Sequence, residues 1–449
     1  MKIKTIRNVF AIALLSFGAP LFAQEATQAS VGTLDIDLAK AIDIALDENP
    51  TIKVADKEIA LKQVANTEAW QSLLPSVSAN LALSNSIKVA AIKTGMGEFK
   101  MGIDGATTAT GALTATLPIF APAIYANMKL TKEDILLSQE KARSSRLDLI
   151  NQVTKAYYAA LLAKDSYEVM QKSYNVSKQN FDVVNNKFNV GSVSEYDKIS
   201  AEVQTRAMNS SVVSAKTGLA LALLRLKVLM GITENVELNI NDNLRNYEGR
   251  LSMADVNNAI MDLDGNSALR QLDHNAALLK RTRNILKTNF MPTVAAQFSY
   301  QYQSYSNDNW KVWAYHFTPS STLSFSVSVP IFTASNWTKM KSNKLQMESL
   351  QDTRQNTVNQ LKMAVESYRK NMASNMAQVE SNKEAVTQAN KAVSISSKRY
   401  EVGRGTILEL NQSETALTQA ELTYNQSIYE YLSNKADLDY TLGKETYLK

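Results

Sequence analysis

The chain has 449 residues, of which 45% are hydrophobic and 20% charged, and it contains no cysteine. The lack of cysteine excludes disulfide bonds, thiol catalysis, thiolate metal sites and a lipid-modified cysteine behind a signal. The formal net charge of +5 includes basic residues at the amino terminus. The chain beyond this basic amino terminus is therefore nearly neutral and gives no reason to expect nucleic acid as a partner.

The first 23 residues have the pattern of a secretory signal peptide. Lys2, Lys4 and Arg7 precede an apolar run over 9–17, and a short segment ending in Ala23 follows. The run is shorter than the roughly 20 residues that a membrane-spanning helix needs, so we predict export and cleavage after Ala23. No later stretch suits such a helix, and a membrane crossing would therefore have to use strands.

A first structural unit is predicted over residues 34–231. It begins with a helix over about 38–73, followed by a pair of strands over about 76–117. A long helix over about 121–188 comes next, because this segment is rich in Ala, Leu, Gln, Glu and Lys and has almost no Gly or Pro after its first turn. We expect Gly191 to turn the chain into a returning helix, since a tight reversal often requires positive φ.

The second unit, over 256–443, repeats this order. It follows an equatorial linker over 232–255, and a tail over 444–449 comes after it. The predicted strand pair of this unit covers about 293–331, and its tip turn lies at Gly403. The long helix of each unit would reach about 100 Å at 1.5 Å per residue, which no compact domain can hold.

The two units are copies of one another. Residues 117–120 recur as 329–332 and residues 188–191 as 400–403, at one offset of 212, whereas the offset upstream is 217. The five-residue difference falls inside the first strand pair, where a surface loop tolerates insertion. Each strand pair lies between two prolines that we predict to mark strand–helix junctions: Pro75, Pro118, Pro292 and Pro330.

Both long helices carry apolar residues at intervals of seven. A strict heptad keeps one narrow stripe facing a partner helix, so we predict coiled-coil packing, with an ordinary amphipathic helix as the alternative. The two series are Val153, Ala160, Tyr167, Tyr174, Phe181 and Phe188, then Val365, Met372, Val379, Val386, Val393 and Tyr400.

The strand pairs alternate apolar with small polar residues, as Phe325 and Val327 do with the serines beside them. This alternation predicts a sheet with one apolar and one polar face. Each strand has about ten residues, enough to cross a bilayer at a tilt. Trp310 and Trp313 in the second connecting loop are typical of a membrane interface, with an ordinary loop cluster as the alternative.

Four strands cannot close a barrel, and an open sheet in lipid would leave the hydrogen-bonding groups of its edges unsatisfied. Three chains would supply twelve strands, an even number wide enough to leave a channel. The predicted fold class is therefore an α+β membrane protein. Its duplicated helix–β-hairpin–long helix–helix unit would form, as a trimer, a 12-stranded barrel continued by a coiled-coil helical barrel.

The tip sequences are the most specific motifs. Arg-Tyr-Glu-Val-Gly over 399–403 is followed by Thr-Ile-Leu-Glu-Leu over 406–410, and Phe-Asn-Val-Gly over 188–191 by Asp197. In these motifs the chain resembles the TolC-like outer-membrane efflux proteins, over about residues 34–444. The resemblance implies a homotrimer with its barrel in the lipid of the outer membrane and a long periplasmic helical extension.

The resemblance also implies a set of site residues. Asp197 and Glu409 each lie six residues after a tip glycine and would form an acidic ring at the pore constriction, which would attract cations. Solvated carboxylates on a helix face are the alternative. Tyr400 and Arg404 would lock the closed tip, with Asp197 as a hydrogen-bond acceptor for the tyrosine.

Two positions depart from the pattern of the family. Gly405 stands where well-known members have arginine, although Arg404 is adjacent, and Gln412 stands where they have a second acid. These departures predict a less acidic ring and a weaker lock. Arg404 is alternatively an ordinary exposed residue or part of the surface that an adaptor meets.

The predicted function is that of a passive exit duct for efflux or type I secretion. The resemblance implies a periplasmic adaptor and an inner-membrane pump of the resistance-nodulation-division, ABC or another class. No catalytic motif, cofactor site or metal site is expected, because His274 and His316 are the only histidines and neither has a ligand set. The alternative function is a coiled-coil structural protein of the envelope, which would need no membrane strands.

Overall fold

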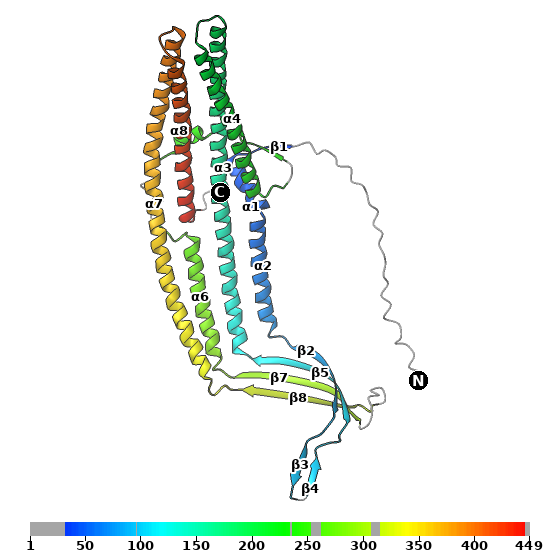
Figure 1. The fold of residues 1–449 in the computed structure, drawn as a ribbon. Coiled ribbons are helices and arrows are strands. Elements are labelled where there is room, and N and C mark those ends of the chain that lie inside the picture. The colour runs from blue at the N-terminus through cyan, green and yellow to red at the C-terminus, as the bar shows by residue number, and fades with distance from the viewer. Residues whose placement is uncertain (1–31, 96, 234–235, 253–261, 307–314, 445–449) are drawn as a thin grey trace, which may run out of the picture.

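The computed structural model describes residues 32–95, 97–233, 236–252, 262–306 and 315–444. The predicted signal peptide, Trp310 and Trp313 lie outside the described residues, as does the tail beyond residue 444. The described part is an elongated bundle of helices with a sheet that bends away from it at one end (Figure 1).

After β1 (Gly32–Asp35), the first half contains four helices and four strands in the described residues, and the order of its main elements follows the prediction. These are α1 (Leu38–Glu48), α2 (Pro50–Gln71), β2 (Ser76–Ser86), β3 (Ala91–Thr94), β4 (Gly97–Lys100), β5 (Ala106–Phe120), α3 (Pro122–Asn189) and α4 (Glu195–Leu229). The second half repeats the order with α6 (Ser267–Thr288), β7 (Thr293–Ser306), β8 (Thr318–Ser328), α7 (Ala334–Glu401) and α8 (Ile407–Thr441).

The predicted first helix is two helices, because the chain bends at Asn49. Asn49 has the extended dihedrals φ −64° and ψ 126°, and Pro50 takes the first helical position of α2. A proline has no N–H to donate to the carbonyl four residues earlier, so α1 cannot continue through Pro50 and a new helix starts there. In the second half, α6 begins only at Ser267, and residues 253–261 lie outside the described part of the chain.

Each long helix packs along two shorter helices that lie end to end. α3 contacts α2 and α4, and α7 contacts α6 and α8 (Figure 1). The heptad positions in the middle of the helices are buried, with Val153, Val365 and Met372 at 0% exposure. Nearer the tips they are half-buried, as at Phe181 and Val386.

The shorter helices meet at two joints that we name seams. In the first seam, Asn49 begins α2 by accepting the N–H of Thr51 at 2.8 Å, while its amide donates to the carbonyl of Leu229, the last residue of α4, at 2.7 Å. In the second seam, Asn266 begins α6 and donates to the carbonyl of Thr441, the last residue of α8, at 2.7 Å. One side chain thus satisfies unpaired groups of both helix ends.

The sheet joins the two halves. Its order is β2-β5-β7-β8, and all neighbours are antiparallel. The central β5–β7 pairing connects the first unit to the second, which leaves β2 and β8 as edges. Within the described residues β2 pairs only with β5 and β8 only with β7, so the outer edge of each of these strands has no partner in the sheet. A small β3–β4 hairpin, which was not predicted, extends beyond the sheet (Figure 1).

A strap formed by residues 236–252 ties the two long helices together. It contains β6 (Val236–Asn239), which pairs in parallel with β1 (Gly32–Asp35), and the 3-10 helix η1 (Leu244–Arg250). Lys164 of α3 donates to the carbonyls of Ile240 and Asp242 at 2.8 and 2.9 Å. On the other side, Glu248 accepts hydrogen bonds from Lys383 of α7 at 2.5 Å and Tyr424 of α8 at 2.7 Å.

Candidate functional site

The four-stranded sheet has two faces of different chemistry, as the alternation predicts. Cross-strand register places hydroxyl and amide side chains in continuous rows on one face. One row is Ser78, Thr114, Ser299 and Thr322, and the next is Asn80, Ala112, Gln301 and Ser320. Every position of β8 is exposed in the single chain, which suits a sheet that faces lipid on one side and water on the other.

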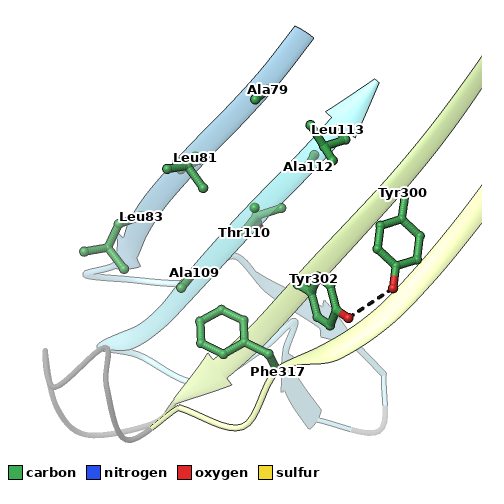
Figure 2. Close-up of a pocket in the computed structure, with 12 residues that line it drawn as sticks. Ala79, Leu81, Leu83, Ala109, Thr110, Ala112, Leu113, Tyr300, Tyr302 and Phe317 are labelled. Carbon is green, nitrogen blue, oxygen red and sulfur yellow. Dashed lines mark hydrogen bonds between the residues drawn. The ribbon is translucent and has the colours of Figure 1, made fainter. Parts of the chain in front are cut away.

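The opposite face is apolar. Figure 2 shows Leu81, Leu113, Tyr300 and Tyr302 around an open hollow of about 660 Å³. Tyr300 and Tyr302 lie edge to face with ring centroids 5.4 Å apart, and their hydroxyls are hydrogen-bonded at 3.0 Å. Gly111 lies between Leu81 and Tyr302 in one cross-strand row, and the Leu81 side chain leans over it, because a Cβ at Gly111 would approach Cδ2 of Leu81 at 3.1 Å.

The predicted junction prolines lie at both ends of the strands. Pro75 directly precedes β2 and Pro292 directly precedes β7, whereas Pro330 lies between β8 and α7. Pro118 lies inside β5, at a shift in register next to Phe120. A proline cannot donate to a ladder, so its place at strand ends and at an irregularity follows from the missing N–H.

No helix in the described residues is long and apolar enough to cross a membrane.

The far ends of the long helices form two similar tip turns. Gly191 has φ +75° and Gly403 φ +73°, as expected for a tight reversal. The following residues, Ser192 and Arg404, each donate a backbone N–H to a carbonyl of the last helical turn, at 2.8 Å in both cases. This arrangement is the Schellman motif, which ends a helix with glycine in the left-handed conformation.

Asp197 and Glu409 both occupy the third position of a returning helix. Asp197 accepts the hydroxyl of Ser194 at 2.7 Å and its backbone N–H at 3.2 Å, while the Ser194 hydroxyl caps the N–H of Asp197. Thr406 caps the N–H of Glu409 at 3.2 Å, and Glu409 lies 3.7 Å from the guanidinium of Arg399. Both acids therefore stabilise a helix start, where a negative charge is favourable.

Tyr400 belongs to a small apolar core just below the tips. Val184, Ala201, Ile407 and Leu410 are at most 2% exposed and pack with the half-buried tyrosine. Its hydroxyl is buried without a hydrogen-bond partner, so the expected bond to Asp197 is absent within one chain. Burial, and then the negative charge of Asp197, raise the pKa of this hydroxyl.

Of the residues that depart from the family pattern, Gly405 lies in the second tip turn and Gln412 in α8. A Cβ on Gly405 would approach Cβ of Arg399 and the backbone N of Tyr400 at 3.1 and 3.2 Å, which explains why the turn holds glycine there. Arg404 is exposed at the apex. Gln412 lines an open groove of about 450 Å³ between α4 and α8, close to Tyr196.

Sequence reasoning missed the residues that hold the seams. Arg143 of α3 donates to the carbonyls of Gly265 and Gly443 at 3.1 Å, and it pairs with Glu140 at 2.9 Å. The repeat of Asn49 as Asn266 was visible in the sequence, and an asparagine before a helix is a capping signal. Nothing in the sequence links Arg143 to two distant carbonyls.

Comparison with protein-family models matches residues 41–232 and 261–444 to the family described as outer membrane efflux protein. Among curated proteins, the chain is similar to the alkaline protease secretion protein AprF of Pseudomonas aeruginosa, with 23% identity over 215 residues. That alignment covers 48% of this chain and 44% of AprF. The chain therefore matches less than half the length of this curated relative.

Solved structures with a similar fold are outer membrane channels and an outer membrane protein. The CmeC channel of Campylobacter jejuni gives a TM-score of 0.70 at 16% identity, covering 90% of this chain and 85% of CmeC. The open state of the MtrE channel of Neisseria gonorrhoeae gives 0.68 at 17%, covering 90% and 88%. VceC of Vibrio cholerae gives 0.67 at 14%, covering 90% and 96%. At these identities the likeness concerns the fold alone.

Proposed function

The chain belongs to the outer membrane efflux protein family, and from this premise we propose that three copies form a passive exit duct across the outer membrane. The barrel part spans the lipid, and the helical part extends into the periplasm. An inner-membrane pump supplies energy and selects cargo, and a periplasmic adaptor joins it to the helical tips. The cargo passes without covalent chemistry, in efflux or in type I secretion.

The observation that carries this proposal is the pair of uncovered edges on a two-faced sheet. β2 and β8 expose backbone groups that lipid cannot satisfy, while the apolar face between them favours lipid. Pairing β8 of one chain with β2 of the next satisfies the backbone groups of both edges. Three copies give twelve strands, a number compatible with a water-filled barrel.

The first test is the native mass of the protein extracted from membranes with detergent. A single species of three chains that resists dilution supports closure by trimerisation. A monomer, or a ladder of sizes that is released without detergent, would favour the coiled-coil structural protein instead.

Cross-linking tests the edge pairing itself. The chain has no cysteine, so Ser78→Cys on β2 can be combined in turn with cysteines along β8, at Ser320, Thr322 and Ser324. Oxidation should yield covalent trimers for at least one pair. Thr114→Cys on the internal strand β5, combined with the same partners, is the matched control and should give none.

The tip acids are proposed to form the constriction of the closed duct. The capping positions of Asp197 and Glu409 support this, since equivalent helix starts in three chains place six acids at the same height. Asp197→Asn with Glu409→Gln keeps hydrogen-bonding groups at the caps and removes the charge. The cation preference of the trimer in a planar bilayer should fall severalfold. Glu195→Gln, in the same first turn as Asp197, is the control and should leave the preference unchanged.

The tip lock is proposed to act between chains. Tyr400 has a buried hydroxyl without a partner within its own chain, so a lock through this hydroxyl requires a shift of the tip that exposes it to a neighbour. Arg404 is already exposed at the apex and can reach a neighbour directly. Tyr400→Phe should raise the open probability of the reconstituted trimer. If Tyr400→Phe and wild type gate alike, the lock does not use this hydroxyl.

Adaptor docking is proposed at the apex of the tips. Val190 and Val402 are 76% and 69% exposed, and Tyr196 beside them is 70% exposed. Exposed apolar residues grouped at one end of a molecule mark an interaction surface. Val190→Asp with Val402→Asp should abolish binding of the cognate adaptor to the purified trimer. Ile395→Asp, an exposed apolar position lower on α7, is the control and should bind normally.

A further inference from the structure

The strands of the membrane sheet contain no charged residue. The sequence windows 69–87, 105–128, 288–307 and 317–338 include all of β2, β5, β7 and β8 and hold no Asp, Glu, Lys, Arg or His. Charged residues make up 20% of the whole chain, so this neutrality is particular to the sheet. It also extends into the first turns of α3 and α7, whose first charged residues are Lys129 and Lys339.

The bilayer explains the neutrality of only one face. A charged side chain on the lipid face would cost about 2–4 kcal/mol at the bilayer midplane, so the apolar face in Figure 2 must avoid charge. The polar face has no such constraint, because a water-filled lumen accepts charged residues and uses them to tune selectivity. The neutrality of the polar face therefore bears on transport rather than on membrane insertion.

The polar face offers hydrogen bonds of both kinds instead of charge. Its rows combine hydroxyls of Ser and Thr, which donate and accept, with carboxamides of Asn and Gln, which do the same through separate atoms. Gln301 is flanked in register by Ala112 and Ser320, and Gln297 by Thr116 and Ser324. Such a wall can hydrogen-bond to cations, anions and neutral polar groups without an ion pair to any of them.

The charged residues nearest to the sheet, such as Lys88 and Asp104, lie beyond the strand ends in sequence, and the tip acids are too far away to impose a field on this wall. The tip acids lie at the opposite end of helices of 68 residues, or about 100 Å from the sheet. The Debye length at physiological ionic strength is about 8 Å. The tip and the membrane passage are therefore electrically independent.

We propose that the membrane passage formed by these strands is blind to charge, admitting polar solutes of either sign equally, so that any discrimination by charge arises outside the strands. The proposal rests on the proposed channel function. It names the cargo class that the barrel accepts: polar molecules regardless of sign, anionic ones included.

Thiol reactivity tests this directly, because the natural chain has no cysteine. Gln301→Cys on the polar face is purified as a trimer and placed in lipid vesicles. Its modification rates with a cationic and an anionic thiosulfonate reagent of equal size are compared with those of a short cysteine peptide. The ratio of the two rates should match the peptide's within about twofold, because no fixed charge lies nearby.

A charged neighbour calibrates the measurement. Ala112 lies directly opposite Gln301, so Ala112→Glu places a carboxylate beside the thiol and should shift the ratio about tenfold toward the cationic reagent. Ala112→Gln, of the same size without charge, should restore the original ratio. Phe325→Cys on the apolar face should react with neither reagent in vesicles.

The outcomes separate the two proposals. If the ratio of the cationic to the anionic modification rate in Gln301→Cys is already shifted as far as in the chain that also carries Ala112→Glu, charge blindness is overturned and the channel proposal stands. An unreactive cysteine at 301 together with a reactive cysteine at 325 would reverse the two faces of the sheet, and the channel itself would then fail.

Discussion

The long helices end in glycine at the tips and the returning helices end in glycine at the seams, yet the two regions use that glycine differently. Gly191, Gly231, Gly403 and Gly443 all have φ between +66° and +75°, and each ends a Schellman motif. At the tips a Cβ would meet no atom within 4 Å, whereas at the seams it would run into the backbone of the adjoining helix. The seams are therefore closed joints and the tips are open turns.

The largest loss of stability is expected at the second seam. In Gly443→Val the new Cβ would overlap the carbonyl oxygen of Gly265, so we expect a loss of more than about 4 kcal/mol and little trimer. Gly403→Val is the matched control. It has the same left-handed backbone and open surroundings, and it should lose only about 1–2 kcal/mol. Trimer yield and thermal unfolding in detergent measure both, and equal losses would remove the distinction between joint and turn.

The helix cap at the second seam should contribute more stability than the helix cap at the second tip. Asn266→Ala removes the cap of α6 and leaves the carbonyl of Thr441 without its partner at a site where Asn266 is 6% exposed. We expect a loss of about 2–3 kcal/mol. Thr406→Ala removes an exposed cap at the tip and should cost about 0.5–1 kcal/mol. Thermal unfolding of both variants in one detergent decides the order, which a larger loss at the tip would contradict.

Much of the fold could be predicted from the sequence, because the residues that encode its turns and strands act locally. A glycine that ends a long Ala- and Gln-rich segment predicts a turn wherever it falls, and the strands follow from a period of two. The difference between Gly403 and Gly443 could not be predicted, because it depends on the backbone of a residue far away in sequence. The same holds for the pairing of β1 with β6 and for Arg143.

Two local signals were present and were missed. Asn49-Pro50 marks the start of a helix rather than the interior of one. Ser194 three residues before Asp197 is a capping box, so the role of this acid at the helix start was predictable. Whether Asp197 and Glu409 also face one another across a pore depends on other chains, which a single sequence cannot position. That part of the site remains a prediction.

The middle of the tube should also respond to pH. Asp165 of α3 accepts the N–H of Leu244 in the strap at 3.0 Å, and its second oxygen is buried without a partner. Burial raises the pKa of this carboxyl to about 6 from 3.8. Protonation therefore stabilises the folded state, an effect that is complete below about pH 4 and is lost as the pH rises through 6.

Asp165→Asn should remove this dependence, which amounts to about 3 kcal/mol. The variant should be more stable than wild type at pH 7 and similar to it at pH 4. Lys164, Glu168 and Arg245, the charged groups around Asp165, remain unchanged in both proteins. Parallel melting curves from pH 4 to 7 provide the measurement, and a variant that keeps the wild-type slope would show that another group titrates.

The smallest expected effect lies at the apex of the tip. Arg404 is exposed, and its backbone rather than its side chain completes the turn. Arg404→Ala should change stability by less than about 0.5 kcal/mol. A larger loss on thermal unfolding would mean that the apex, like the seams, is a packed joint.

The uncovered edges of the sheet also determine how production of the duct scales with synthesis. A single chain cannot satisfy the backbone groups of β2 and β8 in lipid, so stable insertion requires three copies at the same place. The amount inserted should therefore rise more steeply than in proportion to the chain supplied.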